Sequence, residues 1–95
     1  MQRTIDGDDQ FLEFTPAGEF LVIIVGTIGS NVVRVQCEGT TPGTFVPVTD
    51  GGVALALASA GTHKINNPAT GLPYRVGCPA ADYASGSFGL RVEHK

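Results

Sequence analysis

Apolar and polar residues alternate with a two-residue period through most of this chain. Successive side chains of a β-strand point to opposite faces, so this period predicts short strands with one buried and one solvated face. Breaks that contain Gly, Pro or Asn separate the runs. The strands expected from this pattern are residues 10–14, 19–25, 31–38, 44–48, 53–58, 61–66, 72–78 and 87–93.

One run does not alternate. Residues 20–25 are all apolar and rich in β-branched types, which favour a pleated strand over a helix. Its two faces are Phe20, Val22 and Ile24 on one side and Leu21, Ile23 and Val25 on the other. A strand that is apolar on both sides needs cover on both. The domain's core covers one face, and an arm of the chain or another subunit must cover the other. We assign the first face, Phe20 with Val22 and Ile24, to a subunit interface.

Three other strands have one clear buried face each. The expected inward residues are Val33, Val35 and Cys37, then Tyr74, Val76 and Cys78, then Phe88, Leu90 and Val92. Pro47 cannot donate a ladder hydrogen bond, so its strand belongs at a sheet edge or ends in a bulge. Together these runs predict an all-β protein: a two-layer antiparallel sandwich of the jelly-roll kind with about eight short strands, forming one domain over residues 10–95.

The first nine residues are polar and acidic and have no period. We therefore expect residues 1–9 to form a flexible N-terminal arm. Its Asp6-Gly7-Asp8-Asp9 segment has some of the residues of a calcium loop, but neither the spacing nor the closing Glu of one.

Charge and hydropathy exclude two classes of partner. The net charge is −3, and the six Lys and Arg residues are scattered singly, which argues against nucleic-acid binding. The apolar run at 20–25 is far shorter than the roughly 20 residues that cross a bilayer, so no membrane partner is expected. The acidic start lacks the apolar stretch of a secretory signal, and we expect synthesis in a cytoplasm.

The two cysteines, Cys37 and Cys78, are too few to form a disulfide framework. Their inward parity favours two small buried free thiols. A disulfide across the core is the alternative, and a metal site is a weaker one because no His or Cys lies at ligand spacing.

The sequence carries no recognisable catalytic constellation. Its serines stand beside Gly or in turns, and no G-x-S-x-G elbow is present. His63 lies within an expected strand and His94 beside the C-terminus, so both are expected to be structural. The acids lie in the arm, in turns or on polar strand faces. We predict a protein that is not an enzyme and needs no cofactor.

Sugar-binding sandwiches present exposed aromatic rings. The other aromatic residues fit inward or interface positions, which leaves Tyr83, in the connection before the last strand, as the candidate for stacking on a glycan.

The order of the segments resembles small β-sandwich proteins of the virions of tailed bacteriophages. The resemblance covers residues 19–93 and is carried by Thr44-Phe45-Val46-Pro47-Val48, Gly61-Thr62, Tyr74-Arg75-Val76 and Leu90-Arg91-Val92. It implies a head decoration (cement) protein, commonly trimeric, that binds the major capsid protein on the outside of the head and is assembled in the host cytoplasm. A tail or fibre component, or a small carbohydrate-binding module, is the alternative.

Within that interpretation the acidic N-terminal arm contacts the capsid, because an arm that folds on binding can reach neighbouring subunits. The residues assigned to this contact are Arg3, Ile5, Asp6, Asp8 and Asp9.

Overall fold

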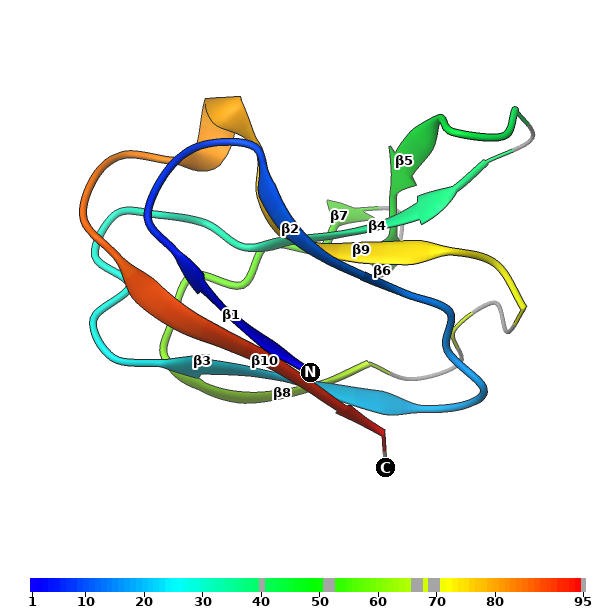
Figure 1. The fold of residues 1–95 in the computed structure, drawn as a ribbon, viewed down its shortest axis with the longest axis horizontal. Helices are drawn as coiled ribbons and strands as arrows, with labels where there is room; N and C mark the ends of the chain where they lie inside the picture. Colours follow the sequence, from blue (N-terminus) through cyan, green and yellow to red (C-terminus); the bar gives the residue numbers. More distant parts are fainter. Residues whose placement is uncertain (40, 51–52, 66–67, 69–70, 95) are drawn as a thin grey trace.

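The protein is a sandwich of two four-stranded antiparallel sheets (Figure 1). The computed structural model describes residues 1–39, 41–50, 53–65, 68 and 71–94. Sheet A has, in spatial order, the strands β1 (Gln2–Ile5), β10 (Phe88–His94), β3 (Phe20–Val25) and β8 (Gly61–Ile65). Sheet B has, in spatial order, the strands β2 (Gln10–Phe14), β9 (Tyr74–Cys78), β4 (Arg34–Glu38) and β5 (Phe45–Pro47). The predicted all-β, two-layer antiparallel class is confirmed.

Three smaller elements complete the described chain. The strands β6 (Thr49–Asp50) and β7 (Val53–Ala54) pair only with each other, and the 3₁₀ turn η1 (Ala80–Asp82) lies between β9 and β10. β5 stands at a sheet edge, so the prediction that the Pro47 strand lies at an edge or ends in a bulge is confirmed.

The strands pair as a set of nested hairpins. β4 pairs with β5, β3 with β8, β2 with β9 and β1 with β10, all antiparallel. Two further pairs, β3 with β10 and β4 with β9, then close the two sheets. The first and last strands are therefore neighbours, and the amino group of Met1 donates to the Val92 carbonyl at 3.2 Å.

The core lies between the inner faces of the two sheets. Of the nine residues predicted to face inward on three strands, eight are buried and Cys37 is half-buried. Aromatic rings fill one end of this core: the centroids of Phe14 and Phe20 lie 4.9 Å apart, edge to face, and Tyr74 lies 5.9 Å from Phe20. Such pairs add stability beyond the area that they bury.

The central strand β3 turns the opposite face inward from the one that we expected. Phe20 and Val22 are fully buried and Ile24 is 2% exposed, all against the chain's own sheet B. The assignment of these three residues to a subunit interface is therefore wrong. The two-residue period separates the faces of a strand but does not say which one meets the second sheet.

The N-terminal segment is part of the fold. β1 pairs with the edge of β10 from Gln2 opposite Arg91 to Ile5 opposite Phe88, and Ile5 is fully buried. The expectation of a flexible arm over residues 1–9 is therefore wrong for β1, and the sandwich domain begins before residue 10. A single buried residue in a polar run produces no period, so the strand could not be recognised from the pattern.

Two of the predicted strands are clearly shorter in the structure. The run 53–58 reduces to β7 and an isolated bridge between Val33 and Leu57, and Val53 is 70% exposed. The run 31–38 becomes regular only at Arg34; before it, Asn31 is a buried polar residue and Val33 forms the isolated bridge to Leu57. The end of the predicted strand at residue 66 lies outside the described residues.

Candidate functional site

The outer face of sheet A carries an apolar stripe, which we define as Leu21, Ile23 and Val25 of β3. Leu21 and Ile23 are half-buried, and Val25 is 58% exposed. β3 lies between β10 and β8, in the middle of the sheet, where neighbouring strands satisfy its backbone on both sides. The side chains of the stripe therefore face solvent within this chain, and they form the one uncovered face of the doubly apolar strand.

Polar residues flank the stripe at the same heights. Leu21 lies between Lys64 on β8 and Glu93 on β10, and Ile23 lies between Thr62 and Arg91. Residues directly opposite each other on neighbouring strands share a face, so all of these side chains point outward with the stripe. The outer face is thus apolar along its centre and charged along both sides.

Each flank contains an ion pair of its own. Lys64 Nζ lies 3.6 Å from Glu19 Oε2, and the Arg91 guanidinium contacts the Glu93 carboxylate. All four side chains are between 39% and 53% exposed. Exposed pairs of this kind contribute little to stability, so both carboxylates and both cations can exchange partners at low cost.

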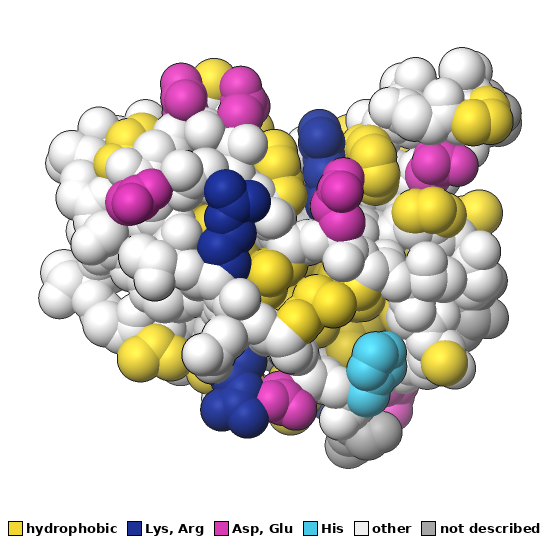
Figure 2. Space-filling model, in the orientation of Figure 1, with side chains coloured by type: hydrophobic (Ala, Val, Ile, Leu, Met, Phe, Trp, Pro, Cys, Tyr) yellow, Lys and Arg dark blue, Asp and Glu magenta, His cyan; other side chains and the backbone are white. Residues whose placement is uncertain are grey.

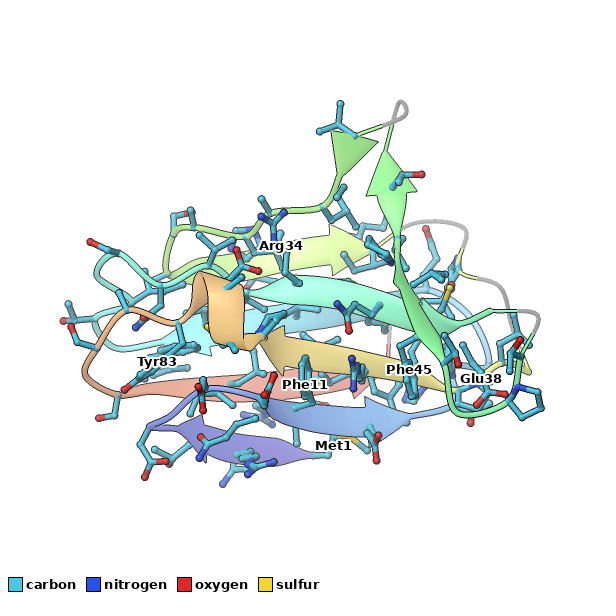
Figure 3. The ribbon with its side chains drawn as sticks, turned by 90° about the horizontal axis from the view of Figure 1, so that it is seen from above. Met1, Phe11, Arg34, Glu38, Phe45 and Tyr83 are labelled. Carbon is cyan, nitrogen blue, oxygen red and sulfur yellow. The ribbon has the colours of Figure 1, made fainter. Side chains whose placement is uncertain are left out.

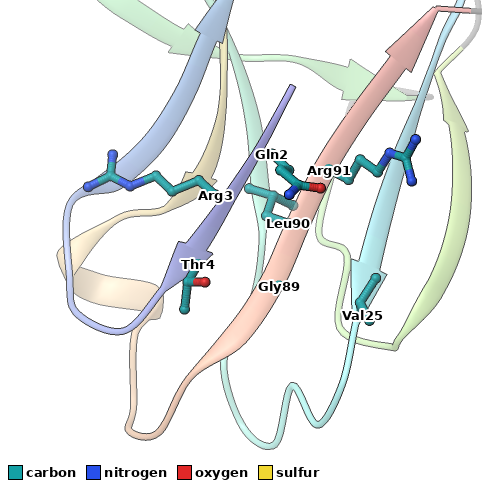
Figure 4. A pocket seen from close by; sticks show the side chains of 7 residues that line it. All are labelled: Gln2, Arg3, Thr4, Val25, Gly89, Leu90 and Arg91. Carbon is teal, nitrogen blue, oxygen red and sulfur yellow. The ribbon is translucent and has the colours of Figure 1, made fainter.

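A hollow of about 440 Å³ opens beside the stripe at its Val25 end (Figure 4). Gly89 opposite Val25 has no side chain, which leaves space between Val25 and the neighbouring Thr4. Figure 4 shows that Arg3 points away from the strand pair and toward β2. The other lining residues are Gln2, Leu90 and Arg91.

The outer face of sheet B has a different chemistry. The Arg75 guanidinium stacks between two rings, with its Cζ 4.1 Å from the Phe11 centroid and 4.5 Å from the Phe45 centroid. The side chains of Phe11 and Phe45 are labelled in Figure 3. Arg75 Nε also donates to Gln36 Oε1 at 2.6 Å. Phe11 and Phe45 both lie on this outer face, so an inward position is wrong for them, and an interface position stays a prediction. Phe11 is opposite Gly77, whose missing side chain leaves room for the ring.

A second hollow, of about 330 Å³, adjoins this stack and is lined by Arg3, Asp9, Phe11, Glu13 and Arg75. Arg3 Nη1 donates to the Phe11 carbonyl at 2.9 Å, and Asp9 Oδ1 accepts from the Ala80 amide at 3.2 Å. The positive charges of two cations and the negative charges of two carboxylates cancel in this hollow. On the side of the molecule seen in Figure 2, acidic and basic side chains are likewise interspersed.

The residues assigned to a capsid-contacting arm are thus divided. Ile5 lies in the core, while Arg3 and Asp9 line the second hollow. Asp6 is tied to Gln10, whose Oε1 accepts from the Asp6 amide at 2.8 Å and whose Nε2 donates to the Asp6 carboxylate at 2.9 Å. Asp8 is exposed at the tip of the β1–β2 loop.

Two polar groups hold the loop between β9 and β10. Arg34 makes a bidentate pair with Asp82, at 3.1 Å from Nε to Oδ2 and 3.2 Å from Nη2 to Oδ1. Asn31 is 1% exposed; its Nδ2 donates to the Ser85 carbonyl at 2.8 Å and its Oδ1 accepts from the Ala84 amide at 2.6 Å. Their hydrogen-bonding groups are used within the chain, so both side chains are structural.

Tyr83 is also used by the fold. Its hydroxyl lies 2.7 Å from the Gly86 carbonyl and 3.1 Å from the Asp6 carbonyl, and its ring packs on the core. The expectation of a free tyrosine for glycan stacking is wrong for this residue. Of the histidines, His63 Nε2 lies 2.8 Å from the Ser59 carbonyl, and His94 meets Phe14 edge to face.

Cys37 and Cys78 are free thiols. Cys78 is buried and donates to the Val32 carbonyl at 3.3 Å, and burial raises the pKa of its thiol. Across the residues that the structure describes, no group of three or more His, Cys, Asp or Glu side chains is placed to hold a metal ion. In the same part of the chain, no helix has the length and apolar character to cross a membrane.

No protein-family model, curated protein or solved structure matches this chain. A function therefore has to be inferred from the surfaces of the protein itself. The apolar stripe could have been found from the sequence, because the run 20–25 shows it directly. The Phe11–Arg75–Phe45 stack could not, since its members come from three separate strands.

Proposed function

We propose that this chain is a non-enzymatic structural protein of a bacteriophage virion, a decoration protein that associates with itself and binds the outside of the head. The proposal joins the resemblance of residues 19–93 to one observation: the apolar stripe on β3 faces solvent in the isolated chain. Contiguous apolar surface that a chain leaves uncovered is a common feature of interaction sites.

The stripe replaces the face that the sequence analysis assigned to the subunit interface. Burying a Val, Leu or Ile side chain completely is worth about 1.5–3 kcal/mol, and the three residues of the stripe begin partly exposed. Covering the stripe with other copies of the chain would therefore contribute several kcal/mol per subunit to the free energy of association. We propose a homotrimer.

The proposed second partner is the major capsid protein, which makes the capsid surface the site of action after assembly in the host cytoplasm. The β1–β2 loop suits this contact, because Asp8 is exposed at its tip while Asp6 and Tyr83 hold its base in place. A preformed loop loses less conformational entropy on binding than a free arm does.

The nested pairing of the strands supports the finer description of the fold as a jelly roll. In that arrangement one long hairpin, with β4 and β5 at its tip and β1 and β10 at its ends, rolls into two sheets of four strands. Jelly rolls are common among viral structural proteins, which agrees with the proposed role.

Self-association is tested by sedimentation of the purified protein and of Ile23→Asp. We expect a trimer for the parent chain and a folded monomer for the variant, because burying a carboxylate in an apolar contact is strongly unfavourable. Val53→Asp is the matched control, since Val53 is 70% exposed and lies away from the stripe. A parent chain that stays monomeric at high micromolar concentration, or an Ile23→Asp trimer, would overturn this part of the proposal.

Capsid binding is tested by co-sedimentation with heads that lack the protein. The parent chain and Val53→Asp should pellet with the heads, whereas Asp8→Lys should weaken binding without changing the circular dichroism spectrum. Failure of the folded parent chain to pellet with any head preparation would refute the decoration role.

The Phe11–Arg75–Phe45 stack favours a second candidate, a carbohydrate-binding module of a tail or fibre. Its neighbouring hollow offers aromatic surface, N–H donors and carboxylate acceptors, which is the mixture that an uncharged polyol requires. A glycan-array signal lost in Glu13→Ala and kept in Glu38→Ala would establish this candidate. Absence of any signal from the parent chain would remove it.

A further inference from the structure

The two sides of the apolar stripe carry opposite charges at the same height. At the level of Leu21, the β8 side presents Lys64 and the β10 side presents Glu93. At the level of Ile23, the β8 side presents Thr62 and the β10 side presents Arg91. The charge of the face is therefore asymmetric across β3, and this asymmetry restricts how copies can meet.

The restriction follows from symmetry. Rotation about an axis parallel to β3 preserves height and brings the β8 side of one copy against the β10 side of the next, so Lys64 faces Glu93. A two-fold axis perpendicular to the strands instead brings the β8 sides of two copies together. Lys64 of each copy then faces the partner's β8 side and does not meet Glu93. Complementary charge selects partners and register more strongly than it adds affinity.

We propose that copies of this chain associate around a rotation axis parallel to β3, with Lys64 of each copy paired to Glu93 of the next across the apolar stripe. This inference rests on the self-association in the proposed function and names its geometry. The pairs that each residue makes within its own chain, Lys64 with Glu19 and Glu93 with Arg91, are exposed and exchange readily.

The shape of the face favours a ring of three over a pair. Val25 protrudes with 58% exposure, and the hollow of about 440 Å³ lies beside it, above Gly89. A two-fold axis along the stripe sets Val25 against Val25 and leaves both hollows empty. In a ring of three the contact is head-to-tail, so the surface around Val25 of one copy can enter the hollow of the next.

Charge reversal tests the pairing. Lys64→Glu and Glu93→Lys each place like charges across the contact and should raise the dissociation constant of the assembly by about tenfold or more at low salt. The double variant Lys64→Glu/Glu93→Lys should recover most of that loss. The matched control is Lys64→Glu/Glu19→Lys, which restores only the pair within one chain and should stay weakened.

Mixing the two single variants distinguishes three copies from two. In a dimer, one Lys64→Glu chain and one Glu93→Lys chain satisfy both contacts, so an equimolar mixture should regain parental affinity. In a ring of three, an unlike mixture always leaves one contact between like charges, and the mixture should stay weaker than the double variant. We expect the second result by sedimentation equilibrium.

The outcomes separate this inference from the function on which it rests. A monomeric parent chain would overturn both self-association and the proposed axis. An oligomer that Ile23→Asp dissociates but that is unchanged by either charge reversal would overturn the axis alone. Rescue by the Glu19 variant instead of the Glu93 variant would likewise overturn it. We expect every variant to fold, since all the altered side chains are exposed or half-buried. Circular dichroism checks this for each one.

Discussion

Gly77 on β9 has no space for a side chain beside β2. A Cβ at this position would lie 2.7 Å from Phe11 Cα and 2.8 Å from Phe11 Cδ1, and it would also meet the Gln10 carbonyl oxygen. The absence of a side chain thus lets the Phe11 ring cover the strand and reach Arg75.

We expect Gly77→Ala to lower the free energy of unfolding by about 3 kcal/mol, because backbone must move to admit the methyl group. Chemical denaturation measures this. Gly18→Ala is the control, since a Cβ at Gly18 meets no atom within 4 Å and should change stability by less than about 0.5 kcal/mol. Equal effects of the two substitutions would contradict the close approach.

The two thiols should differ in reactivity. Burial raises the pKa of the Cys78 thiol, so less thiolate is present at neutral pH, while Cys37 is half-buried. We expect iodoacetamide to alkylate Cys37 at least about tenfold faster than Cys78 in the folded protein, as followed by peptide mass spectrometry. Equal alkylation rates of the two thiols in the native protein would show that the fold does not protect Cys78. The rates in denaturant, where neither thiol is buried, should be equal and serve as the reference.

Among the elements, β1 depends most on partners that are distant in sequence. Its four residues pair with β10 near the other end of the chain, and only Ile5 enters the core. Asp6 and Gly7 then close the loop onto the Gln10 side chain. β1 therefore belongs to the folding unit even though its sequence is that of a solvated arm.

The substitution Ile5→Ala should lower the free energy of unfolding by about 2–4 kcal/mol, because it opens a cavity between the sheets. Thr4→Ala, one residue earlier on the exposed face, should change it by less than about 0.5 kcal/mol. Thermal denaturation measures both. If Ile5→Ala is as stable as the parent chain, the segment does behave as a free arm.

Protection from hydrogen exchange should follow the sheet order across the whole molecule. β10 and β9 each have hydrogen-bonded neighbours on both sides, whereas β6 and β7 pair only with each other over two residues. We expect amides of β10 and β9 to open with free energies of about 5 kcal/mol or more, and those of β6 and β7 with about 1 kcal/mol. Exchange followed by NMR would contradict this architecture if β7 were as protected as β10.

Several features were determined by the sequence alone. The alternation of 72–78 and 87–93 predicted both the strands and their buried faces, because a polar face and an apolar face leave one orientation toward the core. Pro47 restricted its strand to an edge or a bulge for a similarly local reason, since proline has no N–H to donate to a neighbouring strand. The doubly apolar run also indicated, without any structure, that one of its faces lacked cover.

The tertiary structure decided the rest. A period of two cannot say which face of residues 20–25 meets the second sheet, and the packing of sheet B against Phe20, Val22 and Ile24 settled it. β1 exists because β10 offers it an unpaired edge, and the Phe11–Arg75–Phe45 stack exists because three strands distant in sequence become neighbours. These contacts depend on strand order, which local patterns do not encode, and strand order is what brings the apolar stripe and its two charged sides onto one face.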